Sequence, residues 1–216
     1  MMKRTLTEKS WIAQGKLPPD LILDDQKYMH LWNMRPGIKH TIKLFGKECM
    51  IPRQQMVYGV DNYRYSGTEF PSVPIPNCLR PYLEWANQLD DQSYDHLYNM
   101  ILVNWYENGA DYIGSHRDDE AQIIPHTDVM TISFGTERIF RIKYAPIKSA
   151  SGNINDNAVP EKMDIPLVDN HYLVMGGHFQ DEFKHEIPKQ STKKVKGSRI
   201  SLTFRKFRQS VADLNQ

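Results

Sequence analysis

The sequence predicts a mainly β protein with flanking helices, built as an antiparallel sandwich or barrel. Three observations predict this fold class. The chain has 216 residues, the usual size of one domain. Its first forty residues contain one helical pattern, and from about Thr41 short runs of β-branched and aromatic residues alternate with Gly, Pro and Asn-Asp clusters. Hydrophobic residues make up 40% of the chain and charged residues 25%, a composition typical of a folded protein.

The expected elements begin with a loop at Pro18-Pro19-Asp20, followed by a short helix over residues 21–32. A second helix over 81–88 carries proline in its first turn. The stretch from 146 to 166 is too polar for a core and too long for a tight hairpin, so we expect a mobile surface insertion. The best strand patterns lie at 101–106, 131–134, 138–144, 171–175 and 199–205.

Charge, hydropathy and cysteine content exclude several classes of protein. Lys plus Arg number 27 against 26 Asp plus Glu, so the net charge of +1 identifies no partner. No run approaches the roughly 18 apolar residues of a membrane span, and no apolar stretch follows the basic N-terminus. The two cysteines, Cys49 and Cys78, form no C-x-x-C pair. We therefore expect a cytoplasmic or nuclear protein that is neither secreted nor bound to a membrane.

The segment around His116 carries the first candidate chemistry. His116 and Asp118 are two residues apart, so on an extended segment their side chains point the same way and can share a metal ion. A solvated turn is the alternative unless a third ligand exists. His185 shares one face of a candidate strand with Phe183 and Ile187, as a core histidine or as a ligand. Two histidines and one carboxylate suit an Fe(II) oxygenase, and a zinc hydrolase uses the same ligand types.

The strand pattern at 199–205 alternates apolar and polar residues. Ile200 and Leu202 lie on one face, and Arg199 and Arg205 lie on the other. Two arginines leaning together would bind a small dianion, because guanidinium groups bind carboxylates through paired hydrogen bonds. The alternative is the solvated outer face of an edge strand.

Together these segments resemble the AlkB family of Fe(II)- and 2-oxoglutarate-dependent dioxygenases. The resemblance extends from about Phe45 to Phe207, and the order and spacing of its motifs carry it, because each motif is weak alone. Trp105 departs from the family's usual basic residue, but strand alternation turns it away from its two neighbours. The matching segments are Asn104-Trp105-Tyr106, His116-Arg117-Asp118-Asp119-Glu120, Ser133-Phe134-Gly135, His185 and the run R-I-S-L-T-F-R at 199–205.

The resemblance implies a double-stranded β-helix, or jelly roll, within a single domain. Residues 1–40 would form an N-terminal extension packed on the core, 41–75 a nucleotide-recognition lid and 76–216 the dioxygenase core. The implied iron ligands are His116, Asp118 and His185. A second H-x-D, His126-Thr127-Asp128, lies beyond the matching segment, so we do not expect it to bind the iron.

The resemblance also implies a site for the co-substrate 2-oxoglutarate. Arg199 would pair with its distal carboxylate with Tyr106 assisting, while Arg205 and Asn104 would lie toward the end that chelates iron. With dioxygen, the implied reaction converts 2-oxoglutarate to succinate and hydroxylates an N-methyl group on a nucleobase, which is then lost as formaldehyde.

The implied substrate contacts begin in the lid. Tyr63 and Tyr65 would stack on a flipped base, beside Arg53 and Ser66. Phe45, at a turn-like tip, is similar to the hairpin finger that fills the gap left by a flipped base in duplex DNA. Core tyrosines and an apolar strand that ends in a glycine turn are the alternatives.

Further expected contacts are acidic and basic. Asp119, with Glu120 beside it, would accept a hydrogen bond from an exocyclic amine or offset the positive charge of a methylated base. Two arginines of the segment 189–208 are assigned to 2-oxoglutarate, and the other basic residues would contact phosphates unless they form only a soluble face. The segment holds eight basic residues and no acidic ones: Lys189, Lys193, Lys194, Lys196, Arg199, Arg205, Lys206 and Arg208.

From these features we expect a monomeric oxidative demethylase that repairs N-alkylated bases, such as 1-methyladenine and 3-methylcytosine, in DNA. The alternatives are an RNA demethylase on the same scaffold and a non-catalytic nucleic-acid-binding relative.

Overall fold

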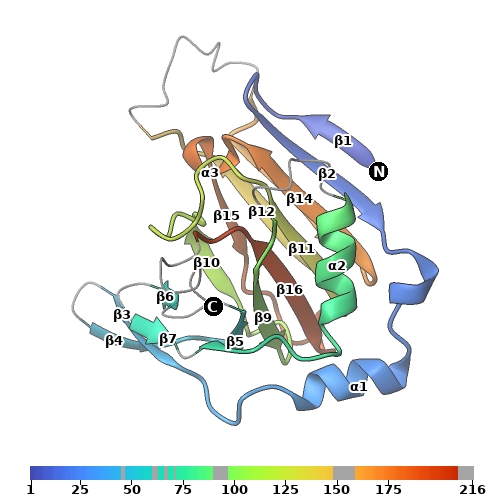
Figure 1. Cartoon of the computed structure of the whole chain (residues 1–216). Helices are drawn as coiled ribbons and strands as arrows, with labels where there is room; N and C mark the ends of the chain where they lie inside the picture. The colour runs from blue at the N-terminus through green and yellow to red at the C-terminus, as the bar shows by residue number, and fades with distance from the viewer. Residues whose placement is uncertain are drawn as a thin grey trace.

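The larger of two facing β-sheets forms the centre of the molecule (Figure 1). The computed structural model describes residues 1–44, 47–59, 63–65, 68–70, 72–89, 97–147 and 159–208. Neighbouring strands of the large sheet are antiparallel, except for a parallel pair at its last edge. In spatial order they are β1 (Met2–Thr5), β2 (Ser10–Lys16), β14 (His171–Gly177), β11 (Val129–Gly135), β16 (Arg199–Arg205), β9 (Met100–Tyr106), β5 (Gln54–Tyr58) and β8 (Ser72–Val73).

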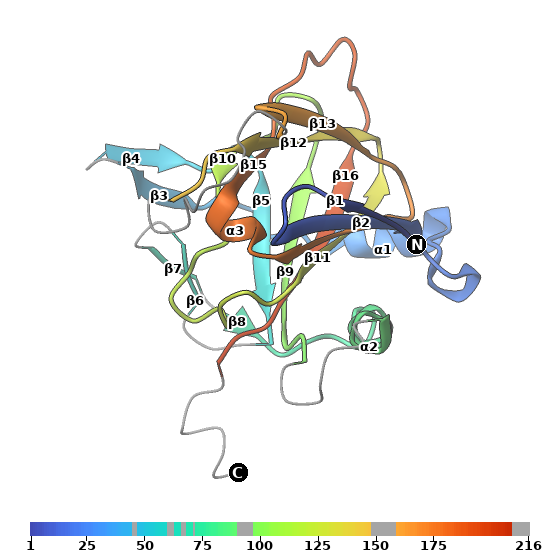
Figure 2. The same cartoon turned by 90° about the horizontal axis from the view of Figure 1, so that it is seen from above.

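The smaller sheet faces the inner side of the larger one, whereas α1 (Asp25–Asn33) and α2 (Arg80–Leu89) lie on the outer side of the larger sheet (Figure 2). The strands of the smaller sheet are β10 (Ile113–His116), β15 (Phe183–Ile187), β12 (Arg138–Tyr144) and β13 (Lys162–Leu167), in that spatial order. Helix α3 (Phe179–Glu182) is short, and Pro19–Leu21 forms a 3-10 turn. The predicted mainly β sandwich with flanking helices is therefore confirmed.

Alternation along β16 explains how this strand serves both layers. Ile200, Leu202 and Phe204 are fully buried in the cluster that includes Leu31 of α1 and Tyr82 of α2. The residues between them face the space between the two sheets, because successive side chains of a strand point to opposite faces. The polar face of β16 is thus an inner wall of the sandwich and not a solvated edge.

Both predicted helices are present, with shifted ends at α1. The expected start at residue 21 lies within the 3-10 turn, and α1 begins only after Asp24, whose carboxylate accepts a hydrogen bond of 2.8 Å from Lys27 N–H. Helix α2 begins next to Pro81, as expected, and buries Tyr82 and Ala86, four residues apart on one face. No helix in the described ranges is long and apolar enough to cross a membrane.

Two strands in the first forty residues were not predicted. Strand β2 pairs with β14 over its whole length, from Lys16 opposite His171 to Ser10 opposite Gly177, and β1 pairs with β2. The segment from 10 to 16 contains Gly, Gln and Ala and has little period-2 pattern. Its strand conformation comes from pairing with a distant strand, which local pattern does not show.

The expected insertion over 146–166 is partly wrong. Residues 148–158 lie outside the described part of the chain, but Lys162–Leu167 forms the edge strand β13 and pairs with β12. Its apolar Ile165 and Leu167 are buried, and Asp164 binds Arg141 on β12 at 2.7 Å. Pro166 fits this position, because an edge strand tolerates a residue without an N–H donor.

The region predicted as the lid is divided between the core and two hairpins. Strand β5 pairs with β9 in the large sheet, so residues 54–58 belong to the core. The hairpins are β3 (Thr41–Leu44) with β4 (Lys47–Met50), and β6 (Tyr63–Tyr65) with β7 (Thr68–Phe70). Both lie on the side of the molecule that carries β10, away from α1 and α2 (Figures 1 and 2).

Candidate active site

The predicted metal ligands come together between the two sheets. Strands β10 and β15 pair so that His116 and His185 lie directly opposite each other, with ring centroids 4.2 Å apart. Asp118 follows β10 by two residues, and its two carboxylate oxygens lie 3.7 Å from His116 Nε2 and 3.7 Å from His185 Nε2. The three residues offer ligand atoms that all lie within 4.8 Å of one another. This is the two-histidine, one-carboxylate arrangement that non-heme iron enzymes use.

The local electrostatics keep these side chains in the protonation states that bind metal. Burial, reinforced by the neighbouring His116, lowers the pKa of His185 to about 3. Burial also lowers the pKa of His116. Burial alone would raise the pKa of Asp118, but the positive charge of Arg205 beside it outweighs burial and lowers that pKa. Two neutral imidazoles and one ionised carboxylate result, which are the ligand forms that a divalent metal requires.

Two neighbours, Arg205 and Gln180, hold Asp118 in place. Arg205 Nη2 pairs with Asp118 Oδ1, and Arg205 Nη1 lies 3.2 Å from Glu120 Oε1. The backbone N–H of Asp118 donates to Gln180 Oε1 at 2.9 Å, which ties the loop after β10 to α3. Arg205 therefore lies at the end of β16 that reaches Asp118 and bridges two acidic residues there.

Arg199 lies at the opposite end of β16 and is suited to bind an anion. It is 2% exposed, it pairs across strands with Tyr106 of β9, and its guanidinium carbon lies 5.1 Å from the centroid of the Tyr106 ring. Its Nη2 donates to Ser133 Oγ at 2.9 Å, while Nε and Nη1 have no hydrogen-bond partner among the described residues. Burial lowers its pKa, because a charged guanidinium is costly away from water. A carboxylate bound here would satisfy both free donors.

One small cavity between the sheets joins the metal end to the arginine end. Apolar side chains, such as those of Phe140, Met175 and Ile187, also line this cavity, so little water surrounds its polar groups. The cavity is lined by all seven residues assigned from the sequence to iron and 2-oxoglutarate: Asn104, Tyr106, His116, Asp118, His185, Arg199 and Arg205. The donor set and the free guanidinium atoms therefore fit both groups.

The position of Arg53 differs from the substrate contact expected of it in the lid. Its side chain is buried, and it donates to Asn104 Oδ1 at 2.7 Å and to Gln55 Oε1 at 2.9 Å. It precedes β5, whose pairing with β9 turns the guanidinium inward. Arg53 thus supports the cavity wall through Asn104 and does not project from an exposed lid.

The remaining substrate contacts are only partly within the described chain. Phe45 and Ser66 lie outside the described residues, although Leu44 and Lys47 pair across the predicted hairpin. Tyr63 and Tyr65 begin and end β6, but the positions of their side chains are not described.

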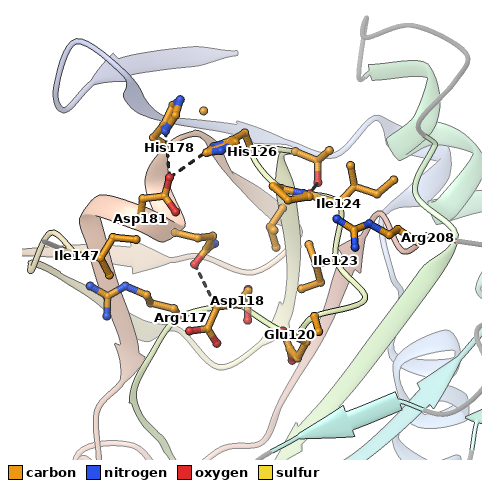
Figure 3. A pocket seen from close by; sticks show the side chains of 17 residues that line it. Arg117, Asp118, Glu120, Ile123, Ile124, His126, Ile147, His178, Asp181 and Arg208 are labelled. Carbon is orange, nitrogen blue, oxygen red and sulfur yellow. Dashed lines mark hydrogen bonds and ion pairs between the residues drawn. The ribbon is translucent and has the colours of Figure 1, made fainter. Parts of the chain in front are cut away.

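A larger pocket of about 270 Å³ opens beside the metal ligands (Figure 3). Asp118, the exposed Asp119 and Glu120 form one end of it. Figure 3 shows His126, His178 and Asp181 grouped at the other end, while Arg208, Ile123 and Ile124 form a side wall.

The basic segment 189–208 is not one surface. Lys206, expected to contact phosphate, is 1% exposed and lies over the ring of Tyr98, so that expectation is wrong. The exposed lysines at 189–196 lie in the segment whose backbone binds Gly109, just beyond Tyr106, and so near the end of β16 that holds Arg199. Arg208 alone among the exposed basic residues of the segment lines the large pocket.

Sequence reasoning missed two supporting residues. Ser133 was recognised as part of a motif but not as a partner of Arg199, although its polar position in an alternating strand is a usable signal. Gln180, which binds the backbone of Asp118, left no signal because α3 lies 62 residues further along the chain.

Comparisons with known proteins agree with this geometry. The chain matches the model of the 2OG-Fe(II) oxygenase superfamily over residues 27–205. The fold and the site therefore define a 2-oxoglutarate- and Fe(II)-dependent oxygenase, and the predicted cofactors Fe(II), 2-oxoglutarate and dioxygen are confirmed at this level. The solved structure of OsALKBH1 shares the fold, with a TM-score of 0.52 and 16% identity over 90% of this chain and 97% of that one.

Comparison with named proteins identifies the family within this superfamily. The human (Homo sapiens) protein called DNA oxidative demethylase ALKBH2 is 32% identical over 175 residues, which cover 79% of this chain and 62% of the human protein. The mouse (Mus musculus) protein of the same name is 31% identical over 171 residues, covering 79% and 68%. The chain belongs to the AlkB family. Its match covers 62% and 68% of the length of these two curated relatives.

Proposed function

We propose that this chain is an oxidative demethylase that removes N-methyl groups from bases such as 1-methyladenine and 3-methylcytosine in DNA. The observation that carries this proposal is the pocket of about 270 Å³ that reaches Asp118 and is lined by Asp119 and Glu120. N-methylation at these base positions leaves positive charge on the ring, and neighbouring carboxylates offset it. Ligand pockets of about 300 Å³ upward hold drug-sized molecules, so this volume suits a single base.

The metal ligands of the chain set where oxidation occurs. His116, Asp118 and His185 would hold Fe(II) and leave coordination positions open toward the cavity. When bound, Fe(II) with 2-oxoglutarate and dioxygen supplies the oxidising chemistry that hydroxylates the N-methyl carbon. Arg205 and Gln180 keep the Asp118 carboxylate and backbone fixed while the site is loaded.

The chain positions 2-oxoglutarate by charge. Arg199 offers two free donors to its distal carboxylate at the buried end of the cavity. Tyr106 lies against the guanidinium, and Asn104, held by Arg53, lies further toward the metal end on the same face of β9. The apolar wall excludes water, so the two ends of the cavity select a short dicarboxylate.

The polymer enters from the side of the larger pocket. A single-base pocket requires the target base to leave the helix stack. Tyr63 and Tyr65 would stack on that base, Phe45 would fill the gap in a duplex, and Arg208 at the pocket wall would contact a phosphate. The names of the human and mouse relatives support DNA as the polymer.

The test is demethylation by the full chain supplied with Fe(II) and 2-oxoglutarate under air. Oligonucleotides of one sequence carry 1-methyladenine or 3-methylcytosine as duplex DNA, single-stranded DNA or single-stranded RNA, with an unmethylated strand as control. Mass spectrometry counts restored bases, and succinate is measured in parallel. We expect duplex DNA to be repaired at least as fast as RNA.

Other outcomes would contradict the proposal in distinct ways. Faster repair of RNA would assign the chain to RNA demethylation. Binding of Fe(II) and 2-oxoglutarate under anaerobic conditions, seen as a visible charge-transfer band, without repair of any oligonucleotide would indicate a non-catalytic relative. Asp119→Asn should raise KM for methylated DNA several-fold, whereas Asp20→Asn, an exposed carboxylate near α1, should not.

A further inference from the structure

A second cluster of metal-ligand side chains lies at the far end of the large pocket. His126 comes from the loop between β10 and β11, while His178 and Asp181 come from the start of α3. Each offers one ligand atom, and these atoms lie within 4.8 Å of one another. Figure 3 shows both imidazoles turned toward the Asp181 carboxylate. Within the described residues, this is the one cluster besides His116, Asp118 and His185 that has such spacing.

The distances match those between ligands of one metal ion. Asp181 Oδ2 lies 3.0 Å from His178 Nδ1 and 3.5 Å from His126 Nδ1. Nitrogen and oxygen ligands bound to zinc at tetrahedral angles lie about 3.3 Å from one another. The imidazole rings stand 4.0 Å apart, with 44° between their planes, so their edges converge on the carboxylate.

A contribution to the stability of the fold does not explain why these three side chains converge. The side chains of His126, His178 and Asp181 are 48%, 38% and 30% exposed, and exposed ion pairs contribute little to stability. His126 also has a φ of 60°, in the left-handed region that few residues other than glycine adopt. This backbone conformation carries the His126 ring to Asp181, whereas Asp128 of the same H-x-D is buried near Gly177 N–H.

Buried hydrogen bonds hold in place the helix α3, which carries Asp181. Glu182, next to Asp181 on α3, is fully buried and accepts hydrogen bonds from Thr7 Oγ1, at 2.5 Å, and from Ser10 Oγ. These contacts tie α3 to β2 and to the turn before it. Ligands held by a rigid backbone lose less entropy on binding a metal than ligands on a free loop.

We propose that His126, His178 and Asp181 form a second metal site for a divalent transition-metal ion of the zinc class. Two imidazoles and one carboxylate suit zinc and its neighbours, whereas calcium and magnesium prefer oxygen ligands only. Three ligands leave at least one coordination position open, and the cluster lines the pocket that also reaches Asp118. Gln180 joins the two sites, since it binds Asp118 N–H and precedes Asp181 on α3.

The test counts zinc ions bound by the tag-free full chain. After equilibrium dialysis against micromolar Zn²⁺, elemental analysis should give two ions per wild-type chain. The double variant His126→Ala/His178→Ala should retain one ion, and so should His116→Ala/Asp118→Ala, because each lacks a different site. The matched control His30→Ala/His171→Ala, which removes two histidines outside both clusters, should retain two.

A milder variant and a direct probe keep the test decisive if a double variant folds poorly. Asp181→Asn should weaken the second zinc equivalent at least tenfold in calorimetry, because a neutral amide is a poorer ligand. Nitrogen-15 spectra of the histidine rings should shift for His126 and His178 when the second equivalent is added. One ion per wild-type chain, or two ions in His126→Ala/His178→Ala, would overturn the proposal and leave a hydrogen-bonded histidine-aspartate network.

Discussion

The two H-x-D motifs of this chain have the same local spacing but different geometries. In His116-Arg117-Asp118 the first residue ends a strand, and both side chains reach one buried centre opposite His185. In the second motif, His126 has a left-handed backbone conformation, so its ring points away from the buried Asp128. His126 instead meets a carboxylate from α3. The comparison shows that backbone conformation and tertiary partners, not spacing, decide which of these side chains come together.

The largest effect should come from removing the carboxylate of the buried centre. Asp118→Ala should abolish succinate formation, because the two remaining imidazoles do not hold Fe(II) firmly in an open site. The variant should still fold, since Arg205 keeps its contact with Glu120. Circular dichroism checks the fold, and a succinate assay checks turnover. Near-normal turnover, or its loss in His126→Ala instead, would show that the ligand assignment is wrong.

The next largest effect should come from Arg199. Arg199→Ala removes charge-assisted hydrogen bonds worth about 1.5–3 kcal/mol, which corresponds to a roughly 10- to 150-fold higher requirement for 2-oxoglutarate. The measurement is succinate formation against 2-oxoglutarate concentration. Arg141→Ala is the matched control, because Arg141 forms a partly exposed pair with Asp164 on the smaller sheet. An unchanged requirement in Arg199→Ala would mean that another cation binds the distal carboxylate.

A smaller effect on one substrate should come from Phe45. A base costs a few kcal/mol to flip from a duplex and little from a single strand, so a side chain that fills the gap helps only the duplex. Phe45→Ala should lower repair of methylated duplex DNA about tenfold, with little change on the same lesion in single-stranded DNA. Kinetics on both substrates measure this. Equal losses on the two substrates would make Phe45 a packing residue.

The smallest functional effect should come from Trp105, which faces away from the cavity. Its Nε1 donates to Leu31 O at 2.9 Å, and its ring packs on the helix side of the large sheet. Trp105→Phe should cost about 1–3 kcal/mol of stability, visible as a lower Tm, with an unchanged 2-oxoglutarate requirement. Tyr106→Phe, one residue further, should instead raise that requirement. A raised requirement in Trp105→Phe would contradict the alternation along β9.

Much of the inner wall could be predicted because strand alternation is a local property. The bounds of β12 and β16 match the patterns at 138–144 and 199–205, and the arginines of β16 do face the cavity. The outer parts were harder to predict. Strands β1 and β2 lack a clear pattern, and Arg53 was expected in a lid although β5 belongs to the core.

Charge runs were the weakest predictor. The basic residues of 189–208 are adjacent in sequence, but β16 separates them by its own length. Lys206 is buried over an aromatic ring, the lysines before Arg199 lie at the far end of the strand, and Arg208 reaches the pocket. A count of charges carries no information on which face or which end of a strand they occupy.

The sequence by itself determined the chemistry of the buried centre: an H-x-D at the end of a strand, an inward histidine among apolar residues, and two arginines on the polar face of the last strand. These signals are visible in the sequence because burial imposes a two-residue period along each strand. Only the tertiary structure decided which residues meet. The pairing of β10 with β15 sets His185 opposite His116, and α3 brings Asp181 to His126. Such meetings join segments more than fifty residues apart, and their register depends on the whole sheet, which no local pattern encodes.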